Sequence, residues 1–356
     1  MVLLAKHAPL IPDLSRSGFL RCDIACDVAR QTRRFVFTVL DEQHTDEYVP
    51  GRYLILEYGD ANGRVRKACY SIVGCPTPCQ VEIIVRRFPD QGVSDAMFSN
   101  LIVGSLVRCS GVGGDITAPR LSGFDSLTFF AGGIGLTLPL ALIRELRGWA
   151  EQGRLVPRVT LLLCTPTLEA TPCLAELMAL ELTEQWFTLR VHVTRELLYQ
   201  DKGCVSRGRP TEAVLAALEV PEGVVICGSH AFALQMQKAV MDQYGAVRCF
   251  IEAFDSPGSQ VPANQAGART VRLKIPASGM EFDAVPSVNL LQQLESQGQP
   301  IRSQCRAGIC GACKIKIMKG ECRREADFAL SANEIDAGYA LACCSYPMGE
   351  ELTICI

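Results

Sequence analysis

The sequence has no marked excess of either charge, no long apolar N-terminal segment, no internal repeat and no low-complexity tract. Its 35 Lys and Arg against 38 Asp and Glu give a net charge of −3, which excludes the basic field that nucleic-acid binding requires. A content of 48% hydrophobic and 21% charged residues is ordinary for a globular protein and excludes extensive disorder. The 356 residues are enough for two or three domains, each with its own core.

The sequence also lacks a clear targeting or membrane segment. The apolar run before Lys6 is too short for the hydrophobic region of a secretory signal, so we expect a cytoplasmic protein. Residues 126–143 carry no charge and reach the lower limit of a bilayer-spanning length. Three glycines and Pro139 interrupt this run, which is typical of a buried strand, a turn and the start of a helix. We therefore expect no contact with a membrane.

Cysteine is abundant, with 18 residues. Because the cytoplasm keeps thiols reduced, this number indicates metal ligands or small buried hydrophobes rather than disulfides. The segment "CRAGICGACK" has the spacing C-x4-C-x2-C, and "LACCS" follows it at a distance. A triplet with a distant fourth cysteine is typical of plant-type 2Fe-2S sites, whereas structural zinc sites, the less fitting alternative, usually add a second pair or histidines. The predicted ligands are Cys305, Cys310, Cys313 and Cys343, with Cys344 as the alternative fourth ligand.

Sequence patterns divide the chain into five parts. After an N-terminal extension, residues 1–18, short β-rich runs such as "GRYLILEYG" in residues 19–122 predict a small antiparallel barrel. In residues 123–254 apolar strands alternate with helical segments, which predicts a doubly wound parallel sheet with its ligand at the carboxyl ends of the strands. Residues 255–268 are rich in Pro, Gly and Ser and predict a linker. Residues 269–356 contain strands, one helix and the cysteine motif.

The two cysteine segments resemble those of the plant-type ferredoxin domain, whose fold is a β-grasp. The resemblance covers residues 269–356 and implies that this domain transfers one electron at a time, so other domains must supply the electrons. The surroundings of the motif are basic, which fits either a solvated face or a docking surface for an acidic partner. The basic residues concerned are Arg302, Arg306, Lys314 and Lys316.

A glycine-rich turn between a strand and a helix occurs in "FFAGGIGLTLPL". Glycines at such a turn let the backbone approach a ligand, and the helix N-terminus favours phosphate. Together with "VVICGSHAF", this segment resembles the pyridine-nucleotide domain of the ferredoxin-NADP reductase superfamily. The resemblance implies a site for the pyrophosphate and the nicotinamide. The residues that it assigns are Gly132, Gly133, Gly135, Thr137, Cys227 and Gly228.

The same superfamily places a flavin-binding barrel before the nucleotide domain, with the motif R-x-Y-S. Here the chain has "KACYSIV", in which Tyr70 and Ser71 match but Ala68 stands where a phosphate-binding arginine is expected. A phosphate needs a nearby cation more than one particular residue. The basic residues that could replace the arginine are Arg66, Lys67 and Arg86.

Two further segments resemble flavin-contacting parts of the superfamily. In "QGVSDAMF", Gly92, Val93 and Ser94 match a turn that opens a short helix and can offer N–H groups and a hydroxyl to phosphate. In "IEAF", Glu252 and Phe254 match the strand end that closes over the flavin.

The order of barrel, nucleotide domain and C-terminal ferredoxin domain resembles that of oxygenase reductases of the phthalate dioxygenase reductase type. This resemblance implies that NADH, or alternatively NADPH, gives hydride to FAD, or alternatively FMN. Electrons then pass singly to the 2Fe-2S cluster and on to a terminal oxygenase, with no catalytic residues beyond the cofactors. Two alternatives stay open. The acceptor could be another redox protein, such as a hybrid-cluster or haem protein, or the chain could be a cluster-only redox sensor that has lost flavin.

Overall fold

In the computed structural model the described residues are 18–40, 47–60, 62–88, 92–196, 203–254, 270–303, 305–325 and 328–356. The chain divides into two compact units, residues 1–252 and 253–356, and each is described by itself. The predicted linker, residues 255–268, and residues 1–17 of the predicted extension lie outside the described residues.

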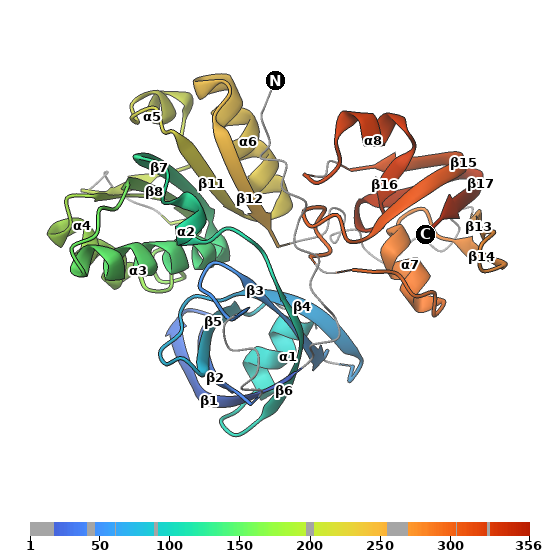
Figure 1. Cartoon of the computed structure of the whole chain (residues 1–356), viewed down its shortest axis with the longest axis horizontal. Coiled ribbons are helices and arrows are strands. Elements are labelled where there is room, and N and C mark those ends of the chain that lie inside the picture. The colour runs from blue at the N-terminus through green and yellow to red at the C-terminus, as the bar shows by residue number, and fades with distance from the viewer. Residues whose placement is uncertain are drawn as a thin grey trace. The chain divides into compact units, whose positions relative to one another are not determined.

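The first part of unit 1 is a six-stranded antiparallel sheet that curves into a barrel (Figure 1). Its elements are β1 (Gly18–Ala29), β2 (Thr32–Val39), β3 (Tyr53–Gly59), β4 (Val65–Ser71), β5 (Gln80–Arg86), α1 (Val93–Asn100) and β6 (Leu106–Gly113). The strand order is β4-β3-β6-β1-β2-β5. On β1, Leu20 and Cys22 are buried while Phe19 and Arg21 face outward, as a strand with one core face requires. The predicted antiparallel barrel is confirmed.

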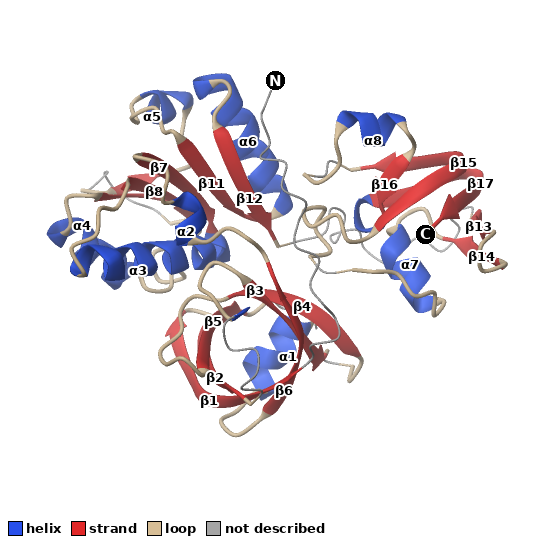
Figure 2. Ribbon diagram, viewed as in Figure 1, coloured by secondary structure: helices blue, strands red, loops and turns tan. Residues whose placement is uncertain are grey.

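The second part of unit 1 is a six-stranded sheet of order β10-β9-β8-β7-β11-β12 with helices along it (Figure 2). Its elements are α2 (Ala118–Leu121), β7 (Ser126–Gly132), η2 (Gly133–Leu136), α3 (Thr137–Glu151), β8 (Arg158–Thr165), α4 (Leu174–Thr183), β9 (Phe187–Val193), β10 (Val205–Arg207), α5 (Glu212–Ala216), β11 (Gly223–Gly228), α6 (His230–Tyr244) and β12 (Arg248–Ala253). The pairs β10/β9, β9/β8, β8/β7 and β7/β11 are parallel. Buried central strands explain the nearly continuous apolar runs. The predicted doubly wound sheet is confirmed.

The uncharged run 126–143 divides as expected. It forms the buried strand β7, the single turn η2 and the first half of α3. Among the described helices, none has both the length and the apolar composition needed to cross a membrane.

Unit 2 contains a five-stranded mixed sheet of order β14-β13-β17-β15-β16. Its elements are β13 (Val271–Ile275), β14 (Met280–Ala284), α7 (Leu290–Ser296), β15 (Lys314–Arg324), α8 (Ala332–Asp336), β16 (Tyr339–Leu341), η3 (Ala342–Cys344) and β17 (Ser345–Cys355). The side chain of Asn289 caps α7 by accepting from the Gln292 N–H, and Leu291 and Leu294 bury the inner face of this helix. The sheet, its parallel β13/β17 pair and the packed helix agree with the predicted β-grasp.

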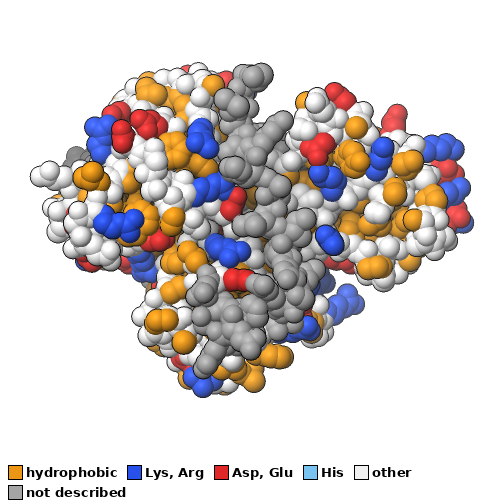
Figure 3. Space-filling model, viewed as in Figure 1, with side chains coloured by type: hydrophobic (Ala, Val, Ile, Leu, Met, Phe, Trp, Pro, Cys, Tyr) orange, Lys and Arg blue, Asp and Glu red, His pale blue; other side chains and the backbone are white. Residues whose placement is uncertain are grey.

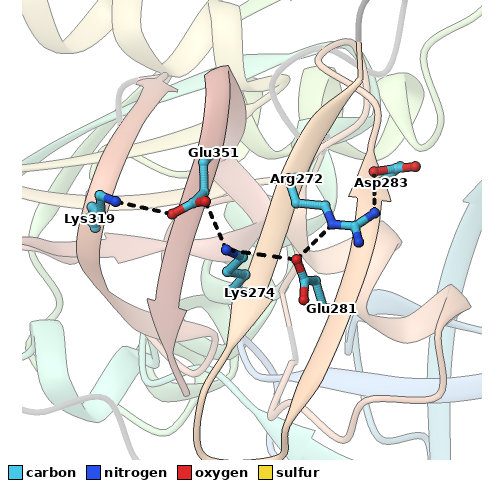
Figure 4. Close-up of polar contacts among 6 residues, drawn as sticks. All are labelled: Arg272, Lys274, Glu281, Asp283, Lys319 and Glu351. Atoms are coloured by element: carbon cyan, nitrogen blue, oxygen red, sulfur yellow. Dashed lines mark hydrogen bonds and ion pairs between the residues drawn. The ribbon is translucent and has the colours of Figure 1, made fainter.

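A chain of ion pairs crosses four strands of this sheet (Figure 4). The members, in order along the chain of ion pairs, are Lys319, Glu351, Lys274, Glu281, Arg272 and Asp283. Because these side chains are largely exposed, solvent and salt screen each pair and its contribution to stability is small. They support the strand register and compensate one another's charges.

Candidate functional site

Three predicted site residues from distant parts of unit 1 form one buried cluster. Ser71, at the end of β4, donates its hydroxyl to Glu252 Oε1 at 2.8 Å. Thr137, the first residue of α3, donates to Ser71 Oγ at 3.3 Å and to the Ile134 carbonyl at 3.1 Å. Ser71 and Thr137 are each 3% exposed and Glu252 is 7% exposed. The cluster therefore joins the barrel to the carboxyl edge of the parallel sheet, at the place where a doubly wound sheet binds its ligand. Phe254 lies just beyond β12 and is half-buried.

A second group of predicted residues lies at the start of α1. The Tyr70 and Ser94 hydroxyls are 3.0 Å apart. Gly92 is the N-cap of α1, and Val93, the first residue of this helix, is buried. A helix N-terminus with adjacent hydroxyls has the donors and the dipole that favour a phosphate group. These residues thus fit the phosphate side of a flavin nucleotide, although their role stays a prediction.

The glycine-rich turn is packed tightly against the neighbouring strand β11. A Cβ on Gly135 would lie 2.2 Å from the Cys227 carbonyl oxygen, and a Cβ on Gly132 or Gly228 would lie 2.8 or 2.7 Å from the Phe232 ring. Cys227 is fully buried, and burial raises the pKa of its thiol well above the ordinary range. The close packing leaves no room for a Cβ at these three positions, which is one reason that they are glycines. Sequence reasoning did not assign Phe232 to this edge, although the residue follows "CGSHA" directly.

Gly133 has a positive φ of +56°, which favours glycine. The guanidinium of Arg86 reaches this turn from the end of β5, with Nη1 3.6 Å from the position of a Cβ on Gly133. Burial, followed by repulsion from nearby Arg195, lowers the pKa of Arg86. A cation beside a glycine turn, with a second arginine near that cation, is suited to an anionic ligand.

Ala68 is half-buried on β4, where it pairs with Leu56 and packs against the barrel core. The neighbouring cations are already paired: Arg66 Nε lies 2.8 Å from Asp60 Oδ2, and Lys67 Nζ lies 3.6 Å from Glu57 Oε1. Arg66 and Lys67 thus face carboxylates, whereas the guanidinium of Arg86 lies beside the Gly133 turn, and which of the three replaces the expected arginine stays a prediction.

A four-residue ion network joins the barrel to the helix α3. Glu82 on β5 accepts from Arg34 Nη2 at 2.8 Å and from Arg144 Nη1 at 2.9 Å. Arg144 also holds both oxygens of Glu176 at 2.7 Å. Burial disfavours the charged form of Glu82, but the two arginines outweigh it and lower the pKa. Sequence reasoning missed this network. The feature that could have indicated it is the glutamate inside the apolar run "QVEIIV".

The four predicted cluster ligands all lie in unit 2, on the 305–313 loop and on η3. Cys305 Sγ accepts three backbone N–H groups, from Ala307 at 3.5 Å, Ile309 at 3.4 Å and Cys310 at 3.3 Å. A hydrogen bond from the Cys310 thiol, together with these backbone donors, lowers the pKa of Cys305 to about 6 despite burial. The loop reaches this form through a left-handed backbone at Arg306, with φ of +56°. A sulfur that accepts several hydrogen bonds is stabilised as a thiolate, which is the form that binds a metal.

The remaining ligands form a second pair, because the Cys343 thiol, followed by burial, raises the pKa of Cys313 well above its ordinary range, and both side chains are buried. Within the described ranges, no three His, Cys, Asp or Glu side chains converge as ligands of one metal ion. A 2Fe-2S cluster has two irons held by four thiolates. Two pairs, Cys305 with Cys310 and Cys313 with Cys343, fit that requirement better than a single-ion site. All 18 cysteines are free thiols in the structure.

The basic surroundings of the motif are partly neutralised. Arg306 Nη2 lies 2.6 Å from Glu295 Oε1, and Lys314 Nζ lies 2.6 Å from Glu334 Oε1. Figure 3 shows both positive and negative side chains on the visible face of unit 2. A docking surface for an acidic partner stays a prediction. Two of the four basic side chains that the sequence offered for it are neutralised by these ion pairs.

Comparison with known families identifies the class to which these sites belong. Residues 22–117 match the model of an oxidoreductase FAD-binding domain. Residues 273–348 match the model of a 2Fe-2S iron-sulfur cluster binding domain. The chain is an oxidoreductase with an FAD-binding domain and a 2Fe-2S cluster binding domain. It has the ferredoxin-NADP reductase-like fold with a C-terminal 2Fe-2S domain.

Individual relatives share this organisation over most of their length. The chain is 26% identical over 306 residues to NADH oxidoreductase HCR of Escherichia coli (strain K12), covering 85% of this chain and 88% of that protein. It is also 26% identical over 362 residues to the ferredoxin reductase component of 3-ketosteroid-9-alpha-monooxygenase of Rhodococcus rhodochrous, covering 97% and 98%. The solved structure of phthalate dioxygenase reductase matches with a TM-score of 0.66 at 21% identity, covering 96% of this chain and 98% of that one.

Proposed function

We propose that this chain is the cytoplasmic, NADH-dependent reductase component of an oxygenase system. The observation that carries the proposal is the joint presence of a flavin-type barrel, a nucleotide-type parallel sheet and two pairs of cluster thiols in one chain. The Rhodococcus rhodochrous relative, similar over nearly the whole length, is named as the reductase component of a monooxygenase.

Each group of residues has a proposed task. Bound FAD would accept hydride from NADH and release its electrons one at a time to the 2Fe-2S cluster. Ser71, Thr137 and Glu252 form a buried polar cluster that orients the ring and the nicotinamide and excludes water. Ser94 and the N-terminus of α1 bind phosphate oxygens, and Arg86 supplies a cation beside the glycine-rich turn.

In unit 2, the loop around Cys305 and the segment η3 hold the cluster. The three N–H groups that point at Cys305 Sγ would stabilise its thiolate. Hydrogen bonds of this kind also set the potential of a cluster. We assign the four ligands as Cys305, Cys310, Cys313 and Cys343.

The test compares the wild type with Cys343→Ser. The wild-type protein should contain FAD and about two irons per chain, show both flavin and cluster bands, and reduce ferricyanide and a terminal oxygenase with NADH. Cys343→Ser should lose the cluster bands yet still reduce ferricyanide, because the barrel has its own core. Acceptor reduction that persists without a cluster would refute the serial electron path.

A second candidate is the reductase of a different redox protein. It is favoured by the Escherichia coli relative, which is named as an NADH oxidoreductase and not as an oxygenase component. Mixing the NADH-reduced protein with a purified terminal oxygenase, a haem protein and a hybrid-cluster protein separates the two, since only the physiological acceptor should oxidise it rapidly. A cluster-only sensor is disfavoured by the FAD-binding match at residues 22–117.

A further inference from the structure

Cys344, the alternative fourth ligand in the sequence, lies directly beside the assigned ligand Cys343. The two sulfur atoms are 3.5 Å apart on η3, a distance at which one thiol hydrogen-bonds the other. Both residues belong to the unit 2 core, with Cys343 0% exposed and Cys344 1% exposed. In the thiol form either sulfur can be the donor.

Metal binding fixes the direction of this hydrogen bond. A metal-bound cysteine is a thiolate, which has no proton to donate and a negative charge that accepts. Cys343 is the assigned ligand, so its metal-bound sulfur can only accept in the 3.5 Å contact with Cys344. The Cys344 S–H then donates to the Cys343 sulfur.

The segment that carries this contact is held on both sides. The Ala342 N–H donates to the Cys313 carbonyl at 2.9 Å, which ties η3 to the ligand loop. The Glu325 N–H donates to the Cys344 carbonyl at 2.8 Å, which ties η3 to the end of β15. Because the residues are buried, the S–H···S contact lies in a medium of low dielectric, where a hydrogen bond is electrostatically stronger than in water.

We propose that Cys344 tunes the 2Fe-2S cluster by donating its S–H to the Cys343 thiolate, and that this raises the reduction potential of the cluster. The inference rests on the proposed function, because it requires a cluster bound through Cys343. Reduction adds one electron to the cluster and increases the negative charge on its sulfurs, so a donor stabilises the reduced form more than the oxidised form. Cys344 therefore acts through a ligand and is itself a positioning residue.

Two variants of the full-length holoprotein remove the donor. Cys344→Ala deletes the thiol, and Cys344→Val replaces it with an apolar side chain that fills the site, so a packing defect in one variant does not decide the result. Cys344→Ser keeps a donor. The matched control is Cys355→Ala, which removes an exposed thiol from the same unit.

The measurement is the midpoint potential of the cluster, followed by EPR during a mediated redox titration. In Cys344→Ala and Cys344→Val the equilibrium constant for reduction should fall by about threefold to tenfold, which is roughly 30–60 mV at 59 mV per tenfold change. Cys344→Ser and Cys355→Ala should stay near the wild-type potential. Iron content should be unchanged in all four variants.

Three results overturn the inference. An unchanged potential in both Cys344→Ala and Cys344→Val would show that the thiol does not act on the cluster, while NADH-driven acceptor reduction in the wild type would leave the proposed function standing. Loss of iron from the Cys344 variants and its retention in Cys343→Ser would make Cys344 a ligand. A wild-type protein without any cluster would refute the proposed function and this inference together.

Discussion

The ion network of Arg34, Glu82, Arg144 and Glu176 permits a quantitative test of how the barrel is fixed to the nucleotide domain. The change Glu82→Gln removes the charge between the two arginines. Breaking a buried ion pair by removing one partner costs about 3–5 kcal/mol. The Glu82 side chain is only 6% exposed, but the Arg34 and Arg144 side chains are 29% and 28% exposed, and Arg144 keeps Glu176. We therefore expect a smaller loss, about 2–3 kcal/mol.

The assay is thermal unfolding at neutral pH, where a loss of this size lowers Tm by roughly 4–12 °C for a domain of this length. The control is Glu151→Gln, which breaks an exposed pair with Arg147 on the same helix α3 and should cost about 0–1 kcal/mol. Equal Tm losses in the two variants would refute the reasoning. The rate of flavin reduction by NADH should also fall in Glu82→Gln and not in the control, because displacement of a reactant group by about 1 Å can cost roughly 10²-fold in rate.

The pH dependence of Tm provides a second test of the same variant. The pKa of Glu82 is lowered in the folded protein, so its charge contributes stability above the ordinary glutamate pKa, and that contribution is lost as pH falls through the lowered value. The difference in Tm between wild type and Glu82→Gln should therefore shrink in acid below about pH 4.3. A difference that does not change with pH would indicate a packing effect instead.

Three further predictions concern single sites. Ala68→Arg should hold FAD at least as tightly as the wild type, because a charge-assisted hydrogen bond to phosphate contributes about 1.5–3 kcal/mol; weaker binding in a flavin titration would show that Ala68 does not face the phosphate. Gly135→Ala should abolish nucleotide-dependent flavin reduction or soluble expression, because its Cβ would lie 2.2 Å from the Cys227 carbonyl oxygen; normal kinetics would contradict the packing. Glu334→Gln should lower the Tm of the ferredoxin unit at pH 7, with the difference vanishing as pH falls from about 4.5 toward 2, since a hydrogen bond from Lys314, followed by those from Ser331, lowers the pKa of Glu334 to about 2; a pH-independent difference would exclude this ion pair as its cause.

The sequence determined the features that depend on local spacing. Three of the four cluster ligands lie within nine residues, so the triplet spacing alone predicts the cluster type, and no tertiary knowledge is needed. The alternation of apolar strands and helices likewise predicts the parallel sheet, because buried parallel strands need continuous apolar runs. Even the apparent membrane segment resolves locally, since glycines and a proline end the strand and open the helix α3.

Only the tertiary structure decided which distant residues meet. Ser71 and Glu252 are separated by 181 positions and share a 2.8 Å hydrogen bond because the barrel and the last strand of the parallel sheet meet there. No local pattern assigns a partner to Glu82 or places the Phe232 ring against the glycine edge, since each contact depends on the path of the chain between its two ends. The same holds for the cluster: the sequence left Cys343 and Cys344 as neighbours in competition, and the fold brings Cys343 to Cys313 because η3 is tied to the ligand loop by a backbone hydrogen bond.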